Sequence, residues 1–383
     1  MTLVLGTKEH TGGPQTHVLI IGVGRYKHLQ GGEAPTPNVP PLGQLKSPPV
    51  SARALADWFT SGAYRNDATL GSVELLLSDA NTDQYDLRDG SAAKVIEAAN
   101  MANIMRAFNE WYARCDADKG NVCFFYFCGH GLERDASILL PEDFAENPNN
   151  PWLTAIDFNR TYRGMAQCRA QTQYYVVDAC RQWTTSMLQD LDVGGQTLKR
   201  ASVLDSHERT APMIFATASG LPAFGDTGDV SRLTAALIEC LDGGGAEKHN
   251  GTWQVSTSRL GESVQKLVNM KNDGLPKEHR QIVNPAVGDY GAGPRVLHKL
   301  PNGKIPEVVV TFVCSPDAAT PNACFYLQRQ GERQDAPAPG LWTKRLKAGV
   351  YDFGVNFPQG TYREWMMSEE TILPPVWPVK LEV

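Results

Sequence analysis

Two apolar runs, about fifty positions apart, constrain the fold of this chain more than any other feature. The first, 123–127, leads directly into Cys128-Gly129-His130-Gly131, and the second, 174–179, ends at Cys180. Such short runs are typical of strands that are buried on both faces of a parallel sheet. The carboxyl ends of parallel strands meet at one edge, where open α/β folds bind ligands. The two runs therefore predict that His130 and Cys180 lie side by side at that edge.

The rest of the chain supplies the other parts of an α/β domain. Strands are expected at 17–22, 73–77 and 213–218, and helices at 52–60, 91–115, 158–168, 232–241 and 258–272. Ser51, Asp157 and Ser231 are suited to cap three of these helices. Six prolines between 31 and 49 exclude regular structure there. The alternation of strands and helices predicts a three-layer α/β domain with a mostly parallel sheet.

At 383 residues, the chain is long enough for one large domain and a smaller one. The α/β domain is expected at 17–287, after a loose tail at 1–16. The stretch 288–306 is rich in Gly and Pro and predicts a linker. Short strand-like runs separated by turns then predict a small all-β domain at 307–383.

Composition excludes several classes of partner. A net charge of −6 lacks the basic excess that general binding to nucleic acid or to acidic membranes needs. There is no run of eighteen apolar residues, so no transmembrane helix is expected. The eight cysteines include no Cys-x-x-Cys pair and no zinc-like Cys/His spacing, so neither a metal site nor a cofactor is expected. Thinly spread thiols suit a reducing compartment, which predicts a cytoplasmic location.

A cysteine and a histidine at one sheet edge can perform nucleophilic catalysis. A thiol attacks a carbonyl only as the thiolate, and a nearby imidazole can take its proton and return it to the leaving amine. Backbone N–H groups close by can stabilise the oxyanion, and Gly131 would let a substrate approach the main chain. A lone cysteine or histidine at such a position is usually structural, so the specificity of the signal comes from the combination.

The chain resembles the caspase-like cysteine proteases of peptidase family C14, in their bacterial and metacaspase-type branch. The matching segments stand in family order at 17–22, 41–55, 125–131, 177–181, 215–219 and 231–237. The His-to-Cys spacing of about fifty residues is also that of caspases. The resemblance covers 17–287 and implies the caspase-like fold. It also implies that Cys180 is the nucleophile, that His130 is the base, and that the N–H groups of Gly131 and Cys180 form the oxyanion hole.

The residue two positions before the nucleophile bears on specificity. Animal caspases have Gln there, which helps to hold an acidic P1 side chain, whereas this chain has Asp178. A carboxylate in the P1 pocket should attract Arg or Lys, and the metacaspase branch, which prefers basic P1 residues, also has Asp there. Cys128 replaces that branch's serine and is expected in the pocket wall. Alternatively, Asp178 only caps a turn or pairs with Arg181.

The region 183–212 stands where caspases are cut between their large and small subunits, and it contains Lys199-Arg200. Cleavage after Arg200 would suit an enzyme with a basic P1 preference and would make the chain a zymogen. The alternative is an ordinary surface loop. Calcium activation, seen in some metacaspases, would need an acidic cluster, and Asp190, Asp192 and Asp205 are too weak a signal to predict one.

These features together predict a regulated bacterial cysteine endopeptidase that cleaves after Arg or Lys in one or a few proteins. Bacterial relatives include proteases of defence or programmed-death systems. Two alternatives remain open: a catalytically silent caspase-fold scaffold that binds a partner, and a protease with another P1 preference. The C-terminal domain carries no catalytic motif, so it either docks a partner or activator or is a structural appendage.

Overall fold

The computed structural model describes residues 2–6, 12–37, 39, 41–81, 83–87, 92–133, 136–181, 195–202, 208–217, 228–360 and 362–383. The chain forms two compact units. The first comprises Met1–Ile238 and Ser256–Lys299, and the second comprises Glu239–Val255 and Leu300–Val383. None of the helices in the described ranges is long and apolar enough to cross a membrane.

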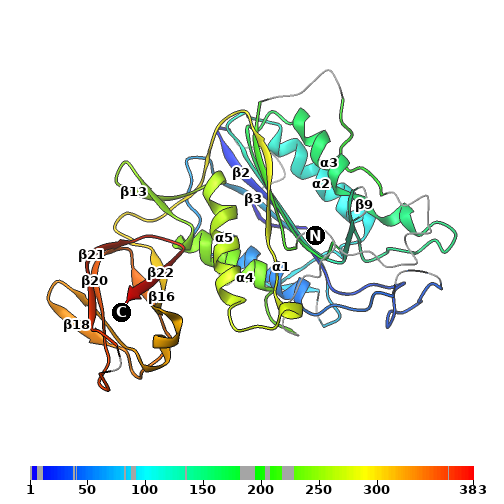
Figure 1. Ribbon diagram of the computed structural model, residues 1–383. Coiled ribbons are helices and arrows are strands. Elements are labelled where there is room, and N and C mark those ends of the chain that lie inside the picture. The colour runs from blue at the N-terminus through cyan, green and yellow to red at the C-terminus, as the bar shows by residue number, and fades with distance from the viewer. Residues whose placement is uncertain are drawn as a thin grey trace. The chain divides into compact units, whose positions relative to one another are not determined.

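The first unit is built on a seven-stranded sheet of order β1-β3-β2-β6-β10-β11-β14 within the described ranges (Figure 1). Its strands are β1 (Leu3–Gly6), β2 (Gln15–Val23), β3 (Thr69–Ser78), β6 (Val122–Gly129), β10 (Thr172–Ala179), β11 (Thr210–Phe215) and β14 (Asn284–Tyr290). The five inner strands pair in parallel, and the two edge strands pair antiparallel. The expected mostly parallel sheet is confirmed.

Helices cover both faces of this sheet, which gives the three expected layers (Figure 1). They are α1 (Ser47–Thr60), α2 (Met101–Cys115), α3 (Phe158–Gly164), α4 (Arg232–Glu239) and α5 (Thr257–Lys271). Phe125 of β6 packs on Trp111 of α2 and Phe158 of α3. Its neighbour Phe124 points to the opposite face, where its ring centroid lies 5.1 Å from that of Phe59 in α1. Every residue of β6 is buried because both faces are covered.

Two helices begin at other residues than expected. The helix α1 starts at Ser47, so Ser51 lies inside it and does not cap it, and Pro48 and Pro49 form its first turn. Proline is tolerated there because the first N–H groups of a helix have no intrahelical partner. The helix α2 starts only at Met101, behind the cap Asn100. The expected caps Asp157 and Ser231 do accept hydrogen bonds from the N–H groups of Arg160 and Thr234.

Two regions expected to be irregular contain strands. Within the expected tail 1–16, β1 pairs with the open edge of β3 and buries Val4, and β2 starts already at Gln15. Within the expected linker 288–306, β14 continues to Tyr290 and β15 spans Val296–Lys299. Apolar alternation is weak in such short edge strands, so their pairing depends on the neighbouring strand more than on their own sequence.

The second unit is built mainly of β-strands, as expected for the C-terminal region. It holds the hairpin β12–β13 (Glu247–His249, Thr252–Ser256) and two sheets, of order β19-β16-β22 and β18-β17-β20-β21. These strands are β16 (Glu307–Ser315), β17 (Cys324–Arg329), β18 (Glu332–Asp335), β19 (Trp342–Lys347), β20 (Gly349–Asn356), β21 (Trp365–Ile372) and β22 (Val376–Glu382). Phe312, Phe325 and Phe353 lie at the centre of its core. Trp342, Tyr351 and Phe357 are also buried in this core.

Candidate active site

His130 and Cys180 follow directly on two strands that are in register. In the parallel pair β6–β10, Asp178 lies opposite Cys128 and Ala179 lies opposite Gly129. The next residue on each strand is therefore His130 and Cys180, at the carboxyl edge of the sheet. His130 is 8% exposed, and Cys180 is partly exposed. The structure thus brings both residues to the edge at which the sequence placed them.

Gly131 lies directly against the end of β10, the strand that precedes Cys180. A Cβ atom added at Gly131 would lie 2.8 Å from both the Ala179 Cβ and the Cys180 carbonyl oxygen. Real Cβ atoms do not approach so closely, so any other residue would push the two strand ends apart. Gly131 also starts β7 (Gly131–Glu133), which pairs with β8 (Ser137–Leu139). The main chain after the histidine is therefore both close to Cys180 and held in place.

The ring of His130 is oriented by a main-chain carbonyl. Its Nε2 lies 2.7 Å from the carbonyl oxygen of Gly43. A carbonyl can only accept, so Nε2 carries the proton and Nδ1 is left as the basic nitrogen. The main-chain N–H of His130 donates to the Tyr26 hydroxyl at 2.6 Å, and the two rings are 4.8 Å apart. Neither Tyr26 nor Gly43 was predicted to contribute to the site.

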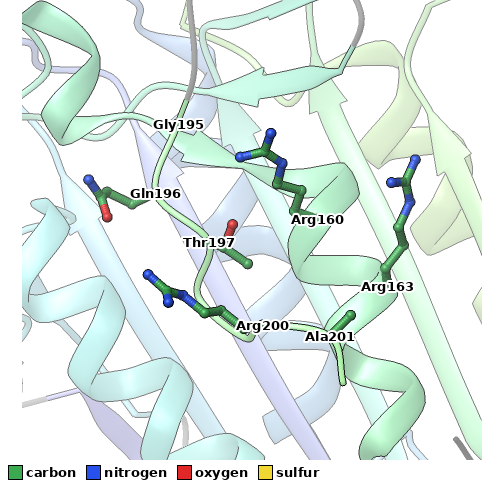
Figure 2. A pocket seen from close by; sticks show the side chains of 7 residues that line it. All are labelled: Arg160, Arg163, Gly195, Gln196, Thr197, Arg200 and Ala201. Atoms are coloured by element: carbon green, nitrogen blue, oxygen red, sulfur yellow. The ribbon is translucent and has the colours of Figure 1, made fainter. Parts of the chain in front are cut away.

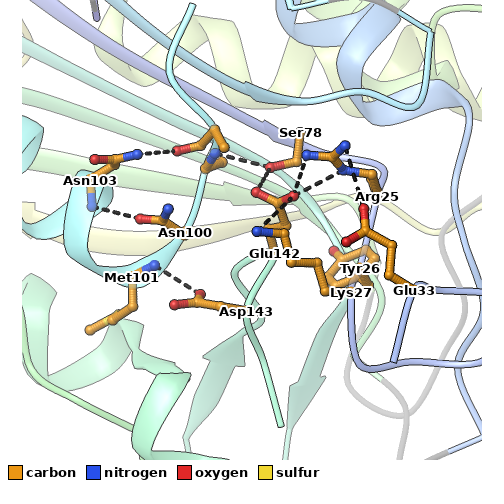
Figure 3. Close-up of polar contacts among 12 residues, drawn as sticks. Arg25, Tyr26, Lys27, Glu33, Ser78, Asn100, Met101, Asn103, Glu142 and Asp143 are labelled. Carbon is orange, nitrogen blue, oxygen red and sulfur yellow. Dashed lines mark hydrogen bonds and ion pairs between the residues drawn. The ribbon is translucent and has the colours of Figure 1, made fainter. Parts of the chain in front are cut away.

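The segment that carries Tyr26 is fixed by a buried carboxylate (Figure 3). Glu142 is fully buried and accepts hydrogen bonds from Arg25 Nη2 at 2.6 Å and from Ser78 Oγ at 3.0 Å. Its carbonyl oxygen accepts from the N–H of Lys27. Because residues on both sides of Tyr26 are bound to Glu142, the phenol that contacts His130 has little freedom to move.

Burial lowers the pKa of His130 to about 4, although the hydrogen bond to Gly43 raises it in part. A histidine acts as a base only while neutral, so His130 stays competent at pH values where an ordinary histidine, with a pKa near 6.5, is protonated.

We expect the acid limb of kcat/KM to lie below about pH 5.5. A pH–rate profile checks this, with circular dichroism at each pH as a control for folding. An acid limb at pH 6.5 or above would contradict it.

Asp178 is buried under the edge and bonded to α4. Its Oδ2 accepts from the hydroxyl of Ser231 and, at 2.7 Å, from that of Thr234. Burial raises the pKa of Asp178, and these two hydroxyls oppose the rise. The buried thiol of Cys128 is also bonded to this carboxylate. The two residues expected in the P1 pocket are thus in contact.

Arg181, the residue after the cysteine, does not pair with Asp178. Arg181 pairs with Glu133, the last residue of β7. The Nη1 of Arg181 also donates to the Thr217 carbonyl at 3.2 Å. Its guanidinium also lies 4.3 Å from the centroid of the Phe215 ring. One side chain therefore connects the ends of β10 and β11 with β7. This brace was not predicted, because Glu133 carries no sequence signal of its own.

Arg200 is exposed beside α3, in a part of the region 183–212 that the structure describes. Residues 183–194 and 203–207 lie outside the described residues, and with them Asp190, Asp192 and Asp205. Within the described ranges, no group of three or more His, Cys, Asp or Glu side chains could hold a metal ion.

The family model of the caspase domain, Peptidase C14, matches residues 15–283. The uncharacterized protein y4kE of Sinorhizobium fredii is 24% identical over 351 residues, which cover 83% of this chain and 97% of that protein. A probable protease of a Desulfuromonadales bacterium is 24% identical over 172 residues, which cover 44% of this chain and 18% of that protein. The crystal structure of caspase-1 from Spodoptera frugiperda aligns at 12% identity with a TM-score of 0.45, over 76% of this chain and 94% of that one.

Proposed function

The chain belongs to the caspase family of peptidases, and from this we propose that it is a cysteine endopeptidase in which Cys180 is the nucleophile and His130 is the base. One observation carries the proposal: a partly exposed thiol and a histidine oriented by Gly43 follow neighbouring strands at the same sheet edge. The similarity of part of the chain to a probable protease supports it further.

In the proposed reaction, Nδ1 of His130 takes the proton of Cys180, and the thiolate attacks the carbonyl carbon of the substrate. The N–H groups of Gly131 and Cys180 stabilise the oxyanion. The C–N bond then breaks, and the imidazolium gives its proton to the leaving amine. Water hydrolyses the thioester, with His130 again acting as the base, and the thiol is restored. The close approach of Gly131 to the Cys180 main chain supports this pairing of donors.

We propose a preference for Arg or Lys at P1, with Asp178 and Cys128 at the pocket. The buried carboxylate of Asp178 supports this choice. Its two hydroxyl partners donate hydrogen bonds but carry no charge, whereas a cationic P1 side chain would compensate the negative charge of the carboxylate. An acidic P1 residue would place a second negative charge beside it.

Fluorogenic peptides with Arg, Lys, Asp or Leu at P1 test the function directly. We expect hydrolysis of the Arg and Lys peptides under reducing conditions, and little of the others. Each peptide is assayed with and without calcium, before and after incubation that permits processing. Cleavage after Asp would overturn the P1 assignment. Absence of hydrolysis of every peptide would favour a caspase-fold scaffold that binds a partner.

We also propose that the enzyme is a zymogen that is cut after Arg200. The exposed position of Arg200 supports this, since P1 residues of processing sites have to reach a second active site. Intact-mass spectrometry of active protein should show a cut that is lost in the Lys199→Gln/Arg200→Gln double variant. A wild type that is fully active and uncut would refute the proposal.

The natural setting we propose is a bacterial cytoplasm, where Cys180 stays reduced, with one or a few proteins as substrates. Cleavage in defence or programmed death is the setting that fits such narrow selectivity. The second unit, with its separate β core, is the proposed docking region for a partner or activator.

A further inference from the structure

The residues just before the proposed processing site are bound to the first unit, in part through an isolated β-bridge. We call 195–199 the docked segment. Gln196 forms a parallel bridge with Ile156 of β9 (Ile156–Asp157). Its N–H donates to the Ala155 carbonyl at 2.6 Å, and its carbonyl accepts from the N–H of Asp157 at 3.0 Å. Both polar main-chain groups of this residue are therefore in use.

Side-chain contacts fix the other end of the docked segment. Leu198 is 8% exposed and belongs to the main hydrophobic core. Its N–H donates to Thr161 Oγ1 of α3 at 3.1 Å. The Lys199 ammonium lies 4.3 Å from the centroid of the Tyr112 ring in α2. The segment thus contacts β9, α3 and α2 within five residues.

Gly164, at the end of α3, fits the main chain of the segment closely. A Cβ atom on Gly164 would lie 1.9 Å from the carbonyl oxygen of Lys199, so no other residue fits while the segment is docked. The backbone of Gly164 itself is helical, with φ −63° and ψ −30°, which alanine also adopts readily. An alanine here should therefore disturb the docking and leave α3 intact.

The two residues at the scissile bond are exposed. Arg200 and Ala201 are exposed, and they line a cavity of about 430 Å³ with Arg160 and Arg163 of α3. In Figure 2, Arg160 and Arg163 extend from α3, whereas Arg200 extends away from both. The P1 side chain is thus presented, while the main chain before it is held.

Proteases bind an extended substrate through its main chain and place alternate side chains in pockets. In the docked segment, the N–H and carbonyl of Gln196 are bonded to Ala155 and Asp157, the N–H of Leu198 is bonded to α3, and the Leu198 side chain, at P3, is in the core. We infer that docking withholds the Arg200–Ala201 bond from proteolysis, so that processing requires the segment to detach first. This inference concerns the regulation of the proposed processing site and rests on that proposal for its biological meaning.

Trypsin, which also cuts after Lys and Arg, tests the inference without the enzyme's own activity. Full-length Cys180→Ala protein is digested briefly, and cuts after Lys199 or Arg200 are timed by mass spectrometry. The rate of cleavage at a site that opens only briefly is proportional to the population of the open form. Leu198→Ala and Gly164→Ala should each raise that population, so we expect each to speed these cuts about tenfold or more. Leu153→Ala, a leucine that is 44% exposed, is the matched control and should change nothing.

Cleavage after Lys304, in an exposed turn, is the internal reference. An unchanged rate there, with an unchanged circular dichroism spectrum, shows that a variant is folded. Equal rates at 199–200 in folded parent and folded Leu198→Ala and Gly164→Ala proteins would overturn the inference. If these variants are cut faster by trypsin but the active parent never cuts itself, docking still protects the bond and the processing proposal fails.

Discussion

Cys180→Ala is expected to abolish peptide hydrolysis, with kcat reduced by about 10⁴–10⁶-fold, the range found when catalytic residues of a well-studied serine protease are removed. The alanine side chain carries no nucleophilic atom, so the covalent intermediate can no longer form at this position. The measurement is hydrolysis of Arg and Lys peptides by each purified protein. Stability should change little, because Cys180 is partly exposed and not part of the close-packed core.

The chain offers a matched control for this variant. Cys324 is also partly exposed, but it lies in β17 of the second unit. Cys324→Ala should retain full activity, and iodoacetamide should inactivate this variant as fast as the parent. Activity that persists in Cys180→Ala would remove Cys180 from the role of nucleophile, and loss of activity in folded Cys324→Ala would show that the effect is not specific to Cys180.

Asp178→Asn is expected to lower kcat/KM for Arg and Lys peptides by about 10²-fold or more, the loss that follows when one partner of a buried charge pair is removed. Asparagine has the same shape and can still bond to the hydroxyls of Ser231 and Thr234. The variant therefore removes the charge and keeps most of the local structure. The readout is the ratio of kcat/KM between Arg and Leu peptides, with the Tm of each protein.

Two neighbouring variants separate the specificity role from a structural one. Ser231→Ala and Thr234→Ala each remove a hydrogen bond to Asp178 but leave its charge, and Ser231→Ala also removes the cap of α4, so each should cost about 1.5–3 kcal/mol of stability. A pocket role predicts that Asp178→Asn alone changes the Arg-to-Leu ratio. If all three variants lower kcat/KM for the Arg peptide and for the Leu peptide alike, in proportion to their loss of Tm, Asp178 only connects β10 to α4.

The placement of His130 and Cys180 could be predicted because both follow runs of mostly apolar residues. The strands β6 and β10 are buried at every position, so composition alone identified them. The parallel arrangement then put the residues after each strand at the same edge. The positions of His130 and Cys180 follow from the strand order alone and do not depend on contacts between distant side chains, which a single sequence does not reveal.

The partners of His130 could not be found in the same way. Gly43 contributes a carbonyl that every residue type has, so no sequence pattern marks it. Tyr26 is one of twelve tyrosines, and its contact with His130 joins positions 104 apart. The start of α1 was missed for a different reason: Pro48 and Pro49 are unfavourable in most of a helix, but not in its first turn.

The carbonyl of Gly43 has a consequence for how this histidine can be altered by mutation. A Cβ on Gly43 would meet no atom closer than 4.0 Å, so many side chains fit there without moving the main chain. Every such substitution keeps the acceptor, and a scan that changes one side chain at a time would rate the position as unimportant. Inserting or deleting one residue between 41 and 46 would shift the oxygen itself. The orientation of the ring thus depends on the length of this loop as well as on side chains such as Tyr26.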